Sequence, residues 1–295
     1  MAEAIVVEST RGSVVEARHR VHAAAVRDGA VVAQAGEPLL ETYLRSSSKP
    51  IQAIPLVRSR NDLTDADVAI ASASHRGTDD QVDAVRALLA KAGATEDDLE
   101  LGLQAGRPPS KLFHNCSGKH AGMLATCAAR GWPFAGYRLP EHPLQKEIAA
   151  LHAEAAEAPI DEMPTAIDGC GVVTFALPLE RIALAYSRLE QLDGGARVAA
   201  AMRARPDLVG GPDGDDYELM TLRDGWTAKG GAEGLFCALG PGGLGVALKT
   251  EDGASRPHRP ALDAFLAPLG VELPWAVVAV ENSRGDLVGE LRVAG

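Results

Sequence analysis

The 295-residue sequence is poor in aromatic residues and has no long hydrophobic run. Aromatic side chains make up only 4% of the chain, so few rings are present on which nucleic-acid bases could stack. No stretch approaches the roughly 20 apolar residues that a helix needs to cross a bilayer. The N-terminal segment MAEAIVVESTRG has neither the basic region nor the long apolar core of a signal peptide. We therefore expect a cytoplasmic protein without a membrane partner.

Positive charge and cysteine are also scarce. The chain has 29 basic and 40 acidic residues, which gives a formal net charge of -11. Such a surface repels phosphate backbones and anionic lipids, so nucleic acid is not an expected partner. In a reducing compartment the few cysteines are thiols that serve as core residues, metal ligands or reactive groups. There are four of them: Cys116, Cys127, Cys170 and Cys237.

The order of secondary-structure signals predicts an α+β fold. The first forty residues indicate strands, and Asp28-Gly29 is a typical hairpin turn. Helical spacing of apolar residues follows, and glycine-punctuated strands return near the C-terminus. A mixed or antiparallel sheet flanked by helices fits this order better than a regular alternation of strands and helices. We expect residues 1–295 to form one unit, with a boundary between two subdomains near residue 160.

Individual segments follow from the same signals. We predict helices over 80–92, 117–130, 143–157, 178–187, 195–204 and 259–269, the second of them with Ser117 as its N-cap. We predict strands over 67–74, 226–229, 235–239, 243–249 and 275–280. The glycine-rich segment 210–216 is expected to be a loop that acts as a mobile flap.

The stretch RSSSKPIQ, from Arg45 to Gln52, places Ser46 three residues before Lys49. On a helix these two positions share a face, so the amine reaches the hydroxyl. A lysine with a depressed pKa then acts as the base that deprotonates the serine. Pro50 argues against a regular helix through Lys49, because the residue before a proline is pushed away from the αR region. Taken alone, this stretch is either a structural turn or a catalytic pair.

The stretch HNCSGKHAG, from His114 to Gly122, puts Cys116 at the predicted start of a helix. The helix dipole there favours a thiolate, and the free N–H groups suit an anion such as a substrate carboxylate. The alternative is a small buried cysteine at a tight turn. Cys116-x-x-Lys119 is not a common zinc spacing, and lysine binds a metal only when deprotonated. Cys170, in the glycine-rich turn DGCG, becomes the second half of a metal site if the two segments lie side by side.

Three further stretches carry candidate polar side chains. ASASHRGT, at 71–78, is either a site at the end of a predicted strand or an ordinary loop. TAKGGAEG and GVALKTEDG place Lys229 and Lys249 on strands, and the first is similar to the Lys-Thr-Gly strand of serine penicillin-recognising enzymes. If both lysines lie on adjacent antiparallel strands, their amines are near one site. Otherwise they belong to the solvated surface.

The chain resembles the asparaginase II family, typified by the rhizobial inducible asparaginase. The resemblance runs from about Val6 to the end, through six stretches in the family's order: RSSSKP, SHRG, HNCSGKHAG, DGCG, KGGAEG and GVALKTEDG. It implies a fold similar to that of serine β-lactamases and glutaminases. It also implies that Ser46 is the nucleophile and Lys49 its base.

The resemblance implies further roles for individual residues. Zn²⁺ would be held by Cys116, Lys119 and Cys170. A second serine–lysine pair would join Ser74 to Lys249 or Lys229. Family members often show Ser-His-Ser-Gly where this chain has Ser74-His75-Arg76-Gly77. Either the second serine is therefore Ser74, or its role is lost or altered in this chain. Arg76 is an alternative residue for binding a carboxylate. The remaining residues expected to bind or orient the substrate are Arg45, His120 and Asp168.

The function implied by the resemblance is hydrolysis of L-asparagine to L-aspartate and ammonia by a homodimeric enzyme. The alternatives are a glutaminase or β-lactam-type amidohydrolase on the same scaffold, a metal-dependent hydrolase, and a non-catalytic protein that binds an amino acid or zinc. The replaced serine in SHRG gives the last alternative its support.

Overall fold

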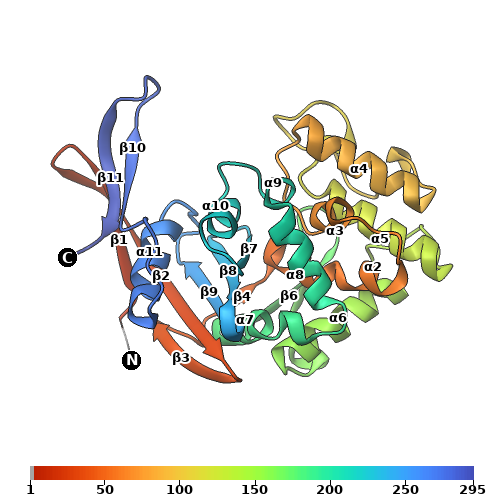
Figure 1. The fold of residues 1–295 in the computed structure, drawn as a ribbon, viewed down its shortest axis with the longest axis horizontal. Helices are drawn as coiled ribbons and strands as arrows, with labels where there is room; N and C mark the ends of the chain where they lie inside the picture. The colour runs from red at the N-terminus through yellow and green to blue at the C-terminus, as the bar shows by residue number, and fades with distance from the viewer. Residues whose placement is uncertain (1–2) are drawn as a thin grey trace.

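The computed structural model describes residues 3–295 and confirms the predicted α+β fold class. Its main sheet is antiparallel, with the strand order β10-β11-β1-β2-β9-β8-β7 and with β3 paired to β2 (Figure 1). The strands are β1 (Ile5–Arg11), β2 (Val14–Arg27), β3 (Ala30–Ala35), β7 (Thr227–Gly230), β8 (Leu235–Gly240), β9 (Leu244–Thr250), β10 (Val277–Glu281) and β11 (Leu287–Val293). Both ends of the chain therefore build one sheet, and the middle of the chain lies outside it.

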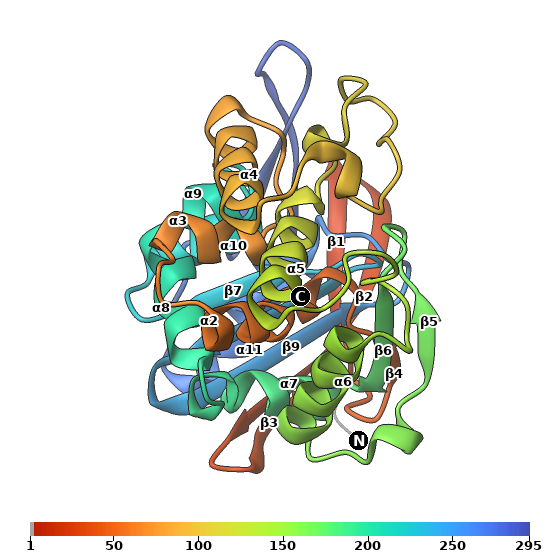
Figure 2. The same cartoon turned by 90° about the vertical axis from the view of Figure 1, so that its right-hand side faces the viewer.

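The middle of the chain is mainly helical and also holds a small sheet of order β4-β6-β5. Its strands are β4 (Glu41–Tyr43), β5 (Thr165–Ile167) and β6 (Val173–Pro178). The longer helices are α2 (Ile54–Ser59), α3 (Asp65–Ala71), α4 (Asp79–Ala92), α5 (Ser117–Arg130), α6 (Pro143–Ala156), α7 (Leu179–Ser187), α8 (Gly195–Ala204) and α10 (Asp215–Leu222). With the helical side toward the viewer, α5 and α6 lie in front of the strands of the main sheet (Figure 2).

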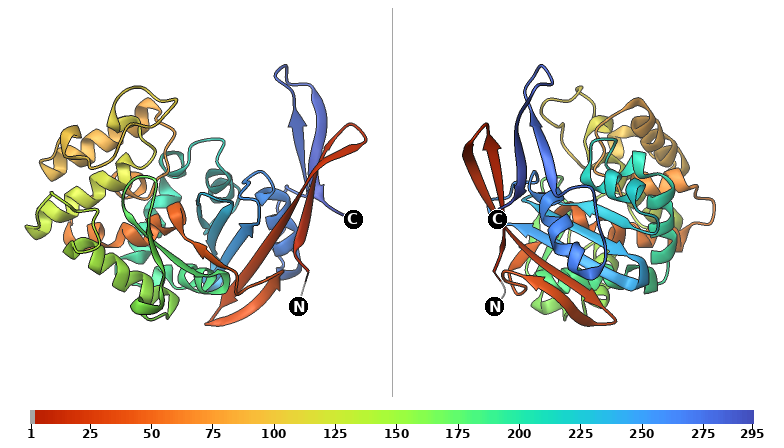
Figure 3. Two further views of the ribbon diagram at one scale, coloured as in Figure 1. Left: turned by 180° about the vertical axis from the view of Figure 1, so that it is seen from behind. Right: turned by 60° about the vertical axis from the view of Figure 1, so that its left-hand side comes forward.

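Two helices pack directly on the main sheet. Helix α7 contacts β2, β8 and β9, whereas α11 (His258–Leu266) contacts β1, β9 and β11. The approach of α7 is close at Gly245, where an added Cβ would lie 2.0 Å from the carbonyl oxygen of Ala183. The hairpin of β10 and β11 projects from the body beside the β1–β2 turn (Figure 3). The helices and the larger part of the sheet thus share one hydrophobic core, and the projecting hairpin extends beyond it.

Most of the predicted helices and strands are confirmed, but the strand predicted over 67–74 is wrong. Residues Asp65–Ala71 form helix α3, and the site-bearing segment that follows it is a loop. Thr64 caps the helix: its side chain accepts a hydrogen bond from the Asp67 backbone, and the Asp67 carboxylate accepts one from the Thr64 backbone. This capping box starts a helix that the apolar run alone did not reveal.

Three smaller expectations are also corrected. Lys49 has helical dihedrals, with φ -60° and ψ -37°, so Pro50 does not interrupt the turn and instead occupies the first turn of α1 (Lys49–Gln52). Cys116, not Ser117, is the N-cap residue of α5. The loop predicted over 210–216 is confirmed for 210–214, but Asp215 and Asp216 begin α10 and Asp216 is buried. A flap motion of this segment stays a prediction. A subdomain boundary near residue 160 stays a prediction. None of the helices in residues 3–295 combines the length and the apolar character needed to cross a membrane.

Candidate active site

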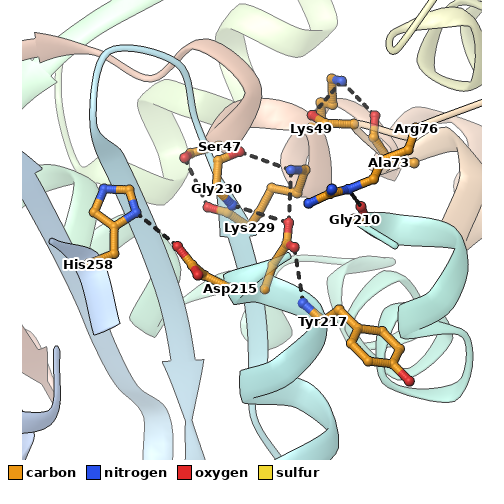
Figure 4. Close-up of polar contacts among 12 residues, drawn as sticks. Ser47, Lys49, Ala73, Arg76, Gly210, Asp215, Tyr217, Lys229, Gly230 and His258 are labelled. Carbon is orange, nitrogen blue, oxygen red and sulfur yellow. Dashed lines mark hydrogen bonds and ion pairs between the residues drawn. The ribbon is translucent and has the colours of Figure 1, made fainter. Parts of the chain in front are cut away.

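Lys49 is the central group of the site. The stretch RSSSKP forms a short 3₁₀ helix, η1 (Arg45–Ser48), that leads into α1, and the Lys49 side chain is fully buried. Its Nζ donates hydrogen bonds to the Ala73 carbonyl oxygen at 2.5 Å and to Ser74 Oγ at 2.9 Å (Figure 4). Ser46 lies one turn earlier and is partly exposed, and among the described residues no hydrogen bond joins its Oγ to Lys49. The structure therefore brings Lys49 together with Ser74, from the SHRG stretch.

The surroundings of Lys49 favour its neutral form. Burial lowers the pKa of the Lys49 amine to about 8, and the nearby charges of Lys119 and Lys229 act in the same direction. The thiols of Cys116 and Cys170 oppose them. An amine with a pKa near 8 is roughly one tenth free base at pH 7 and half free base at pH 8, far more than an ordinary lysine, and a general base requires this free form.

Lys229 is also buried, but it has a carboxylate partner. It lies on β7, and its Nζ is 3.1 Å from Asp216 Oδ2 and 2.9 Å from the Gly230 carbonyl oxygen (Figure 4). Asp216 also accepts hydrogen bonds from the backbone N–H groups of Gly230 and Tyr217. Ser47 Oγ donates to the Lys229 carbonyl oxygen at 3.0 Å. Lys229 is therefore held as one member of a buried ion pair, beside the segment that carries Ser46.

Lys249 lies elsewhere on the sheet. Strand β8 separates β7 from β9, so the arrangement in which Lys229 and Lys249 occupy adjacent strands is wrong. Lys249 is only half-buried, and its amine donates to the Thr250 carbonyl oxygen. Burial lowers the pKa of Lys249, and nearby acidic groups, Glu233 first among them, oppose that shift. Of the two lysines, Lys229 is the one whose charge acts on Lys49.

The HNCSGKHAG and DGCG stretches meet at a second cluster beside Lys49. Lys119 Nζ, on the first turn of α5, lies 3.0 Å from Cys170 Sγ, and both side chains are buried. Cys170 lies in the tight turn between β5 and β6, where the Gly171 backbone N–H donates to the Asp168 carbonyl oxygen. Asp168 accepts a hydrogen bond from Arg45 Nε at 2.7 Å, which ties this turn to the start of η1.

The sulfur atoms of this cluster carry unequal proton affinities. A hydrogen bond from Cys170 lowers the pKa of the Cys116 thiol well below its usual value, and the charges of Lys49 and Lys119 add to the shift. The same hydrogen bond raises the pKa of Cys170. Burial opposes a charge on Lys119, but the two cysteines raise its pKa above the usual value. The pair therefore favours loss of a proton from Cys116 before Cys170, and the two cysteines favour the charged form of Lys119.

The donor set of this cluster fits zinc. Thiolate sulfur and amine nitrogen are ligands that Zn²⁺ accepts, and here they converge from α5 and from the β5–β6 turn in a buried place. Within residues 3–295 no group of three histidine, cysteine, aspartate or glutamate side chains is placed to hold a metal. A zinc site here therefore depends on Lys119, which would have to lose its proton to bind.

His120 is fixed by a tyrosine that the sequence analysis did not identify. The His120 side chain is fully buried, and its Nδ1 lies 2.5 Å from the hydroxyl of Tyr137. That hydroxyl also accepts a hydrogen bond from the Glu100 backbone N–H, so its own hydrogen is available to His120. Burial lowers the pKa of His120 well below its usual value, so the ring is neutral and carries its hydrogen on Nε2. Among the described residues this Nε2 atom has no partner.

The loop that carries Ser74 is held on both sides. The Ser74 backbone N–H donates to Val209, and the His75 backbone N–H donates to Asn115. His75 Nε2 lies 2.8 Å from Ser117 Oγ, which itself donates to the Leu112 carbonyl oxygen. Burial lowers the pKa of His75 to about 3, so the neutral ring serves as the donor to Ser117. Ser117 is thus a link between the SHRG loop and α5, not the cap of that helix.

Arg76 reaches across to the segment predicted as a flap. Its Nε donates to the Gly210 carbonyl oxygen at 3.1 Å, and its Nη1 is 3.6 Å from Asp213. At the start of α10 the two neighbouring carboxylates diverge. Asp215 contacts His258 (Figure 4) and also Arg259, whereas Asp216 faces Lys229. No sequence motif indicated the buried pairing of Asp216 with Lys229, because the acidic run Asp213–Asp216 has the composition of an exposed loop.

The fold and the site define a class of α+β proteins in which a buried lysine is hydrogen-bonded to a serine beside a cluster of sulfur and amine donors. The chain belongs to the L-asparaginase II family, whose model matches residues 7–293. The family predicted from the sequence is therefore confirmed. Membership of this family supports an amidohydrolase that acts on a small-molecule substrate. Among curated proteins, none matches the chain.

Solved structures resemble the chain at the level of the fold. Mglu in its native form in 4.3 M NaCl matches 90% of this chain and 66% of its own, with 15% identity and a TM-score of 0.52. Mglu in its glutamate form matches 86% of this chain and 62% of its own, with 14% identity and a TM-score of 0.51. This chain thus spans about two thirds or less of the length of these Mglu chains. At such identities the likeness concerns the fold alone.

Proposed function

We propose that the chain is an L-asparaginase, which hydrolyses L-asparagine to L-aspartate and ammonia through a serine-bound acyl-enzyme. The observation that carries this proposal is the fully buried Lys49 amine, hydrogen-bonded to Ser74 and one turn from Ser46, in a member of the L-asparaginase II family. A desolvated lysine without a carboxylate partner is suited to remove a proton from a hydroxyl. The lowered pKa of Lys49 supports this role.

In the proposed reaction Ser46 Oγ attacks the side-chain amide carbon of asparagine, and its proton passes to Lys49. Ser74, which contacts the amine, is placed to relay this proton. The C–N bond then breaks, and the leaving nitrogen takes the proton from Lys49 and departs as ammonia. Water attacks the resulting ester, gives a proton back through Lys49 and releases aspartate with a free Ser46. Backbone N–H groups stabilise the oxyanion in both steps.

The substrate is a zwitterion, and the site offers a group for each end. Arg45 is partly exposed and suits the α-carboxylate, whereas Asp168, its ion-pair partner, suits the α-ammonium. The hydrogen on His120 Nε2 is a further donor for a polar substrate atom. Arg76, at the rim, is the alternative partner for a carboxylate.

Zn²⁺ belongs to the proposal as a bound ion, held by Cys116, Lys119 and Cys170. When bound, it supplies a Lewis acid that binds and orients a polar end of the substrate. The serine provides the nucleophile, so the proposed reaction needs no water activated by the metal. We further propose that the enzyme is a cytoplasmic homodimer, which light scattering of the purified protein and fractionation of cells would test.

The decisive experiment compares Ser46→Ala with Ser74→Ala in a coupled ammonia assay, together with intact-mass measurement of the protein during turnover. We expect Ser46→Ala to lose both ammonia release and the acyl adduct. Ser74→Ala should still form the adduct, but more slowly. The reverse pattern would make Ser74 the nucleophile, which its 2.9 Å contact with Lys49 favours as the second assignment. Full activity of both variants would reject the serine mechanism, and loss of activity on chelation would then indicate a metal-dependent hydrolase.

A glutaminase is the second candidate function. The observation behind it is the likeness of the fold to Mglu, which was solved in a glutamate form. One extra methylene in a substrate changes the activation free energy by only about 1–3 kcal/mol, so the scaffold alone does not separate the two amides. Comparison of kcat/KM for asparagine, glutamine and a chromogenic β-lactam would distinguish the activities. Tight asparagine binding without ammonia release would indicate a binding protein.

A further inference from the structure

A cavity of about 560 Å³ lies outside the candidate active site. It is formed where α10 ends and β7 begins, together with the end of β2 and the turn between β8 and β9. Its volume falls within the range of about 300–1,000 Å³ that small-molecule sites occupy. Its lining includes Arg27, Arg223, Asp224, Trp226 and Leu244. None of them takes part in the proposed asparaginase reaction.

Among residues 3–295, two arginines in this cavity have no carboxylate partner for their charge. Most arginines of residues 3–295 lie within 4.0 Å of a carboxylate, but the described structure contains no ion pair for Arg27 or Arg223. Nε of Arg27 is buried and makes no hydrogen bond to any described residue. A buried donor without a partner is unfavourable, so a position that keeps one is suited to a ligand that satisfies it.

The charges and the walls of the cavity define the class of ligand. Two arginines and one acidic residue, Asp224, line it, which leaves a single net positive charge. The planar guanidinium group matches a carboxylate, because both oxygens can accept hydrogen bonds at once. The remaining wall is apolar and includes the nearly buried side chains of Trp226 and Leu244. A monocarboxylate with a compact apolar body satisfies both features.

We propose that this cavity, which we call the Arg27–Arg223 site, binds a small organic monocarboxylate with an apolar or aromatic body. The two guanidinium groups hold the carboxylate, and the apolar wall receives the body of the ligand. The site is independent of the proposed amidohydrolase activity, because it shares no side chain with the candidate active site around Lys49.

The test is a calorimetric titration of the full-length protein with benzoate as the probe and benzyl alcohol as its neutral counterpart. We expect saturable one-to-one binding of benzoate at millimolar concentrations, and at least about tenfold weaker binding of benzyl alcohol. Arg27→Gln and Arg223→Gln should each raise the Kd for benzoate by about tenfold or more. Arg86→Gln, which changes an exposed arginine on α4, should leave the Kd unchanged.

Circular dichroism and thermal unfolding would establish that the variants remain folded before the titrations are compared. Each substitution lies at the surface of the cavity rather than in the core, so both variants are expected to fold. Three results would overturn the proposal: no saturable binding of benzoate to the unaltered protein, equal binding of benzyl alcohol, or benzoate binding that neither substitution weakens. Asparagine turnover is not part of this readout, so its absence would reject only the proposed function.

Discussion

At the scale of single residues, burial gives each lysine of the site a different character. Lys49 contacts only neutral oxygen atoms, Lys119 lies beside sulfur, and Lys229 is paired with a carboxylate. Burial lowers the pKa of Lys49, which has no direct anionic partner. Burial also opposes a charge on Lys119, but there Cys170 and Cys116 raise the pKa above its usual value. The family's motifs predicted these lysines at one site. The sequence did not show which lysine has its charge balanced by a neighbouring anionic group.

The pKa of Lys49 leads to a prediction about pH. The base must be the free amine, so kcat/KM for asparagine should rise with pH, reach half its maximum near pH 8 and then level off. Lys49→Arg, which keeps the charge but cannot lose it, should lower kcat by about 10²–10⁴-fold. Lys91→Arg, on the far helix α4, is the matched control and should keep both the rate and the profile. A flat profile between pH 6 and 10 would contradict the role of Lys49.

The Asp216–Lys229 pair leads to a prediction about stability. Removal of one partner leaves a buried charge, so Asp216→Asn should lower the free energy of unfolding by about 3–5 kcal/mol in urea denaturation. The double variant Asp216→Asn with Lys229→Met removes both charges and should recover part of that loss. Asp224→Asn, at an exposed position, should change the free energy of unfolding by less than about 0.5 kcal/mol. Equal effects of the two single aspartate variants would show that the buried pair has no special role.

At the scale of elements, the close packing of α5 on α3 sets the positions of Cys116 and Lys119. Gly118 and Gly122 face α3, and an added Cβ on Gly118 would lie 2.2 Å from the Ile70 carbonyl oxygen. Glycine is unfavourable within a helix, so its presence at two positions on one face marks a close approach of backbones. The same helix carries Ser117, which contacts His75 and so connects to Ser74.

Gly118→Ala is therefore expected to destabilise the protein, although the same change in an open helix stabilises it. The added methyl group meets backbone atoms of α3, which cannot move aside easily, so the free energy of unfolding should fall by about 1–3 kcal/mol. Gly102→Ala is the control, because an added Cβ there meets no atom within 4 Å. A stabilised Gly118→Ala protein would mean that α5 and α3 are less tightly packed than described.

The elements also show how far the sequence could predict this protein. Periodicity located the long helices and the C-terminal strands, since each buries one regular face. It failed at 67–74, where a short alanine-rich run is compatible with either structure and the cap at Thr64 decides. The motifs predicted that Lys49, Lys119 and Cys170 belong to one site. Tyr137 contacts His120 and Asp216 contacts Lys229, but neither Tyr137 nor Asp216 lies in a recognisable sequence motif. Such pairs depend on tertiary packing, which a single sequence does not display.

At the scale of the whole molecule, the sulfur–amine cluster connects two distant parts of the chain. Cys116 is the N-cap of α5 and Lys119 lies on its first turn, whereas Cys170 comes from the turn that precedes β6. A metal bound there acts as a cross-link and stabilises the folded state, since the unfolded chain does not hold these donors together.

Metal content should therefore follow the two cysteines of the cluster. The purified protein is expected to carry about one zinc per chain by elemental analysis, and Cys116→Ser or Cys170→Ser should lose it together with part of the thermal stability. Cys127→Ser is the matched control: this thiol is also buried, and burial alone raises its pKa to about 12. Zinc retained in Cys170→Ser, or lost equally from Cys127→Ser, would reject the ligand set.

The sheet built from both chain ends has a consequence for synthesis on the ribosome. Strand β2 emerges early, but its partner β9 follows only after more than two hundred residues. At ordinary elongation rates the interval is roughly 10–45 s, during which the segment Val21–Val26, buried in the folded protein, lacks the strand that completes its pairing. The nascent N-terminal hairpin is thus a natural client for a chaperone, and the helical middle of the chain is the part able to fold first.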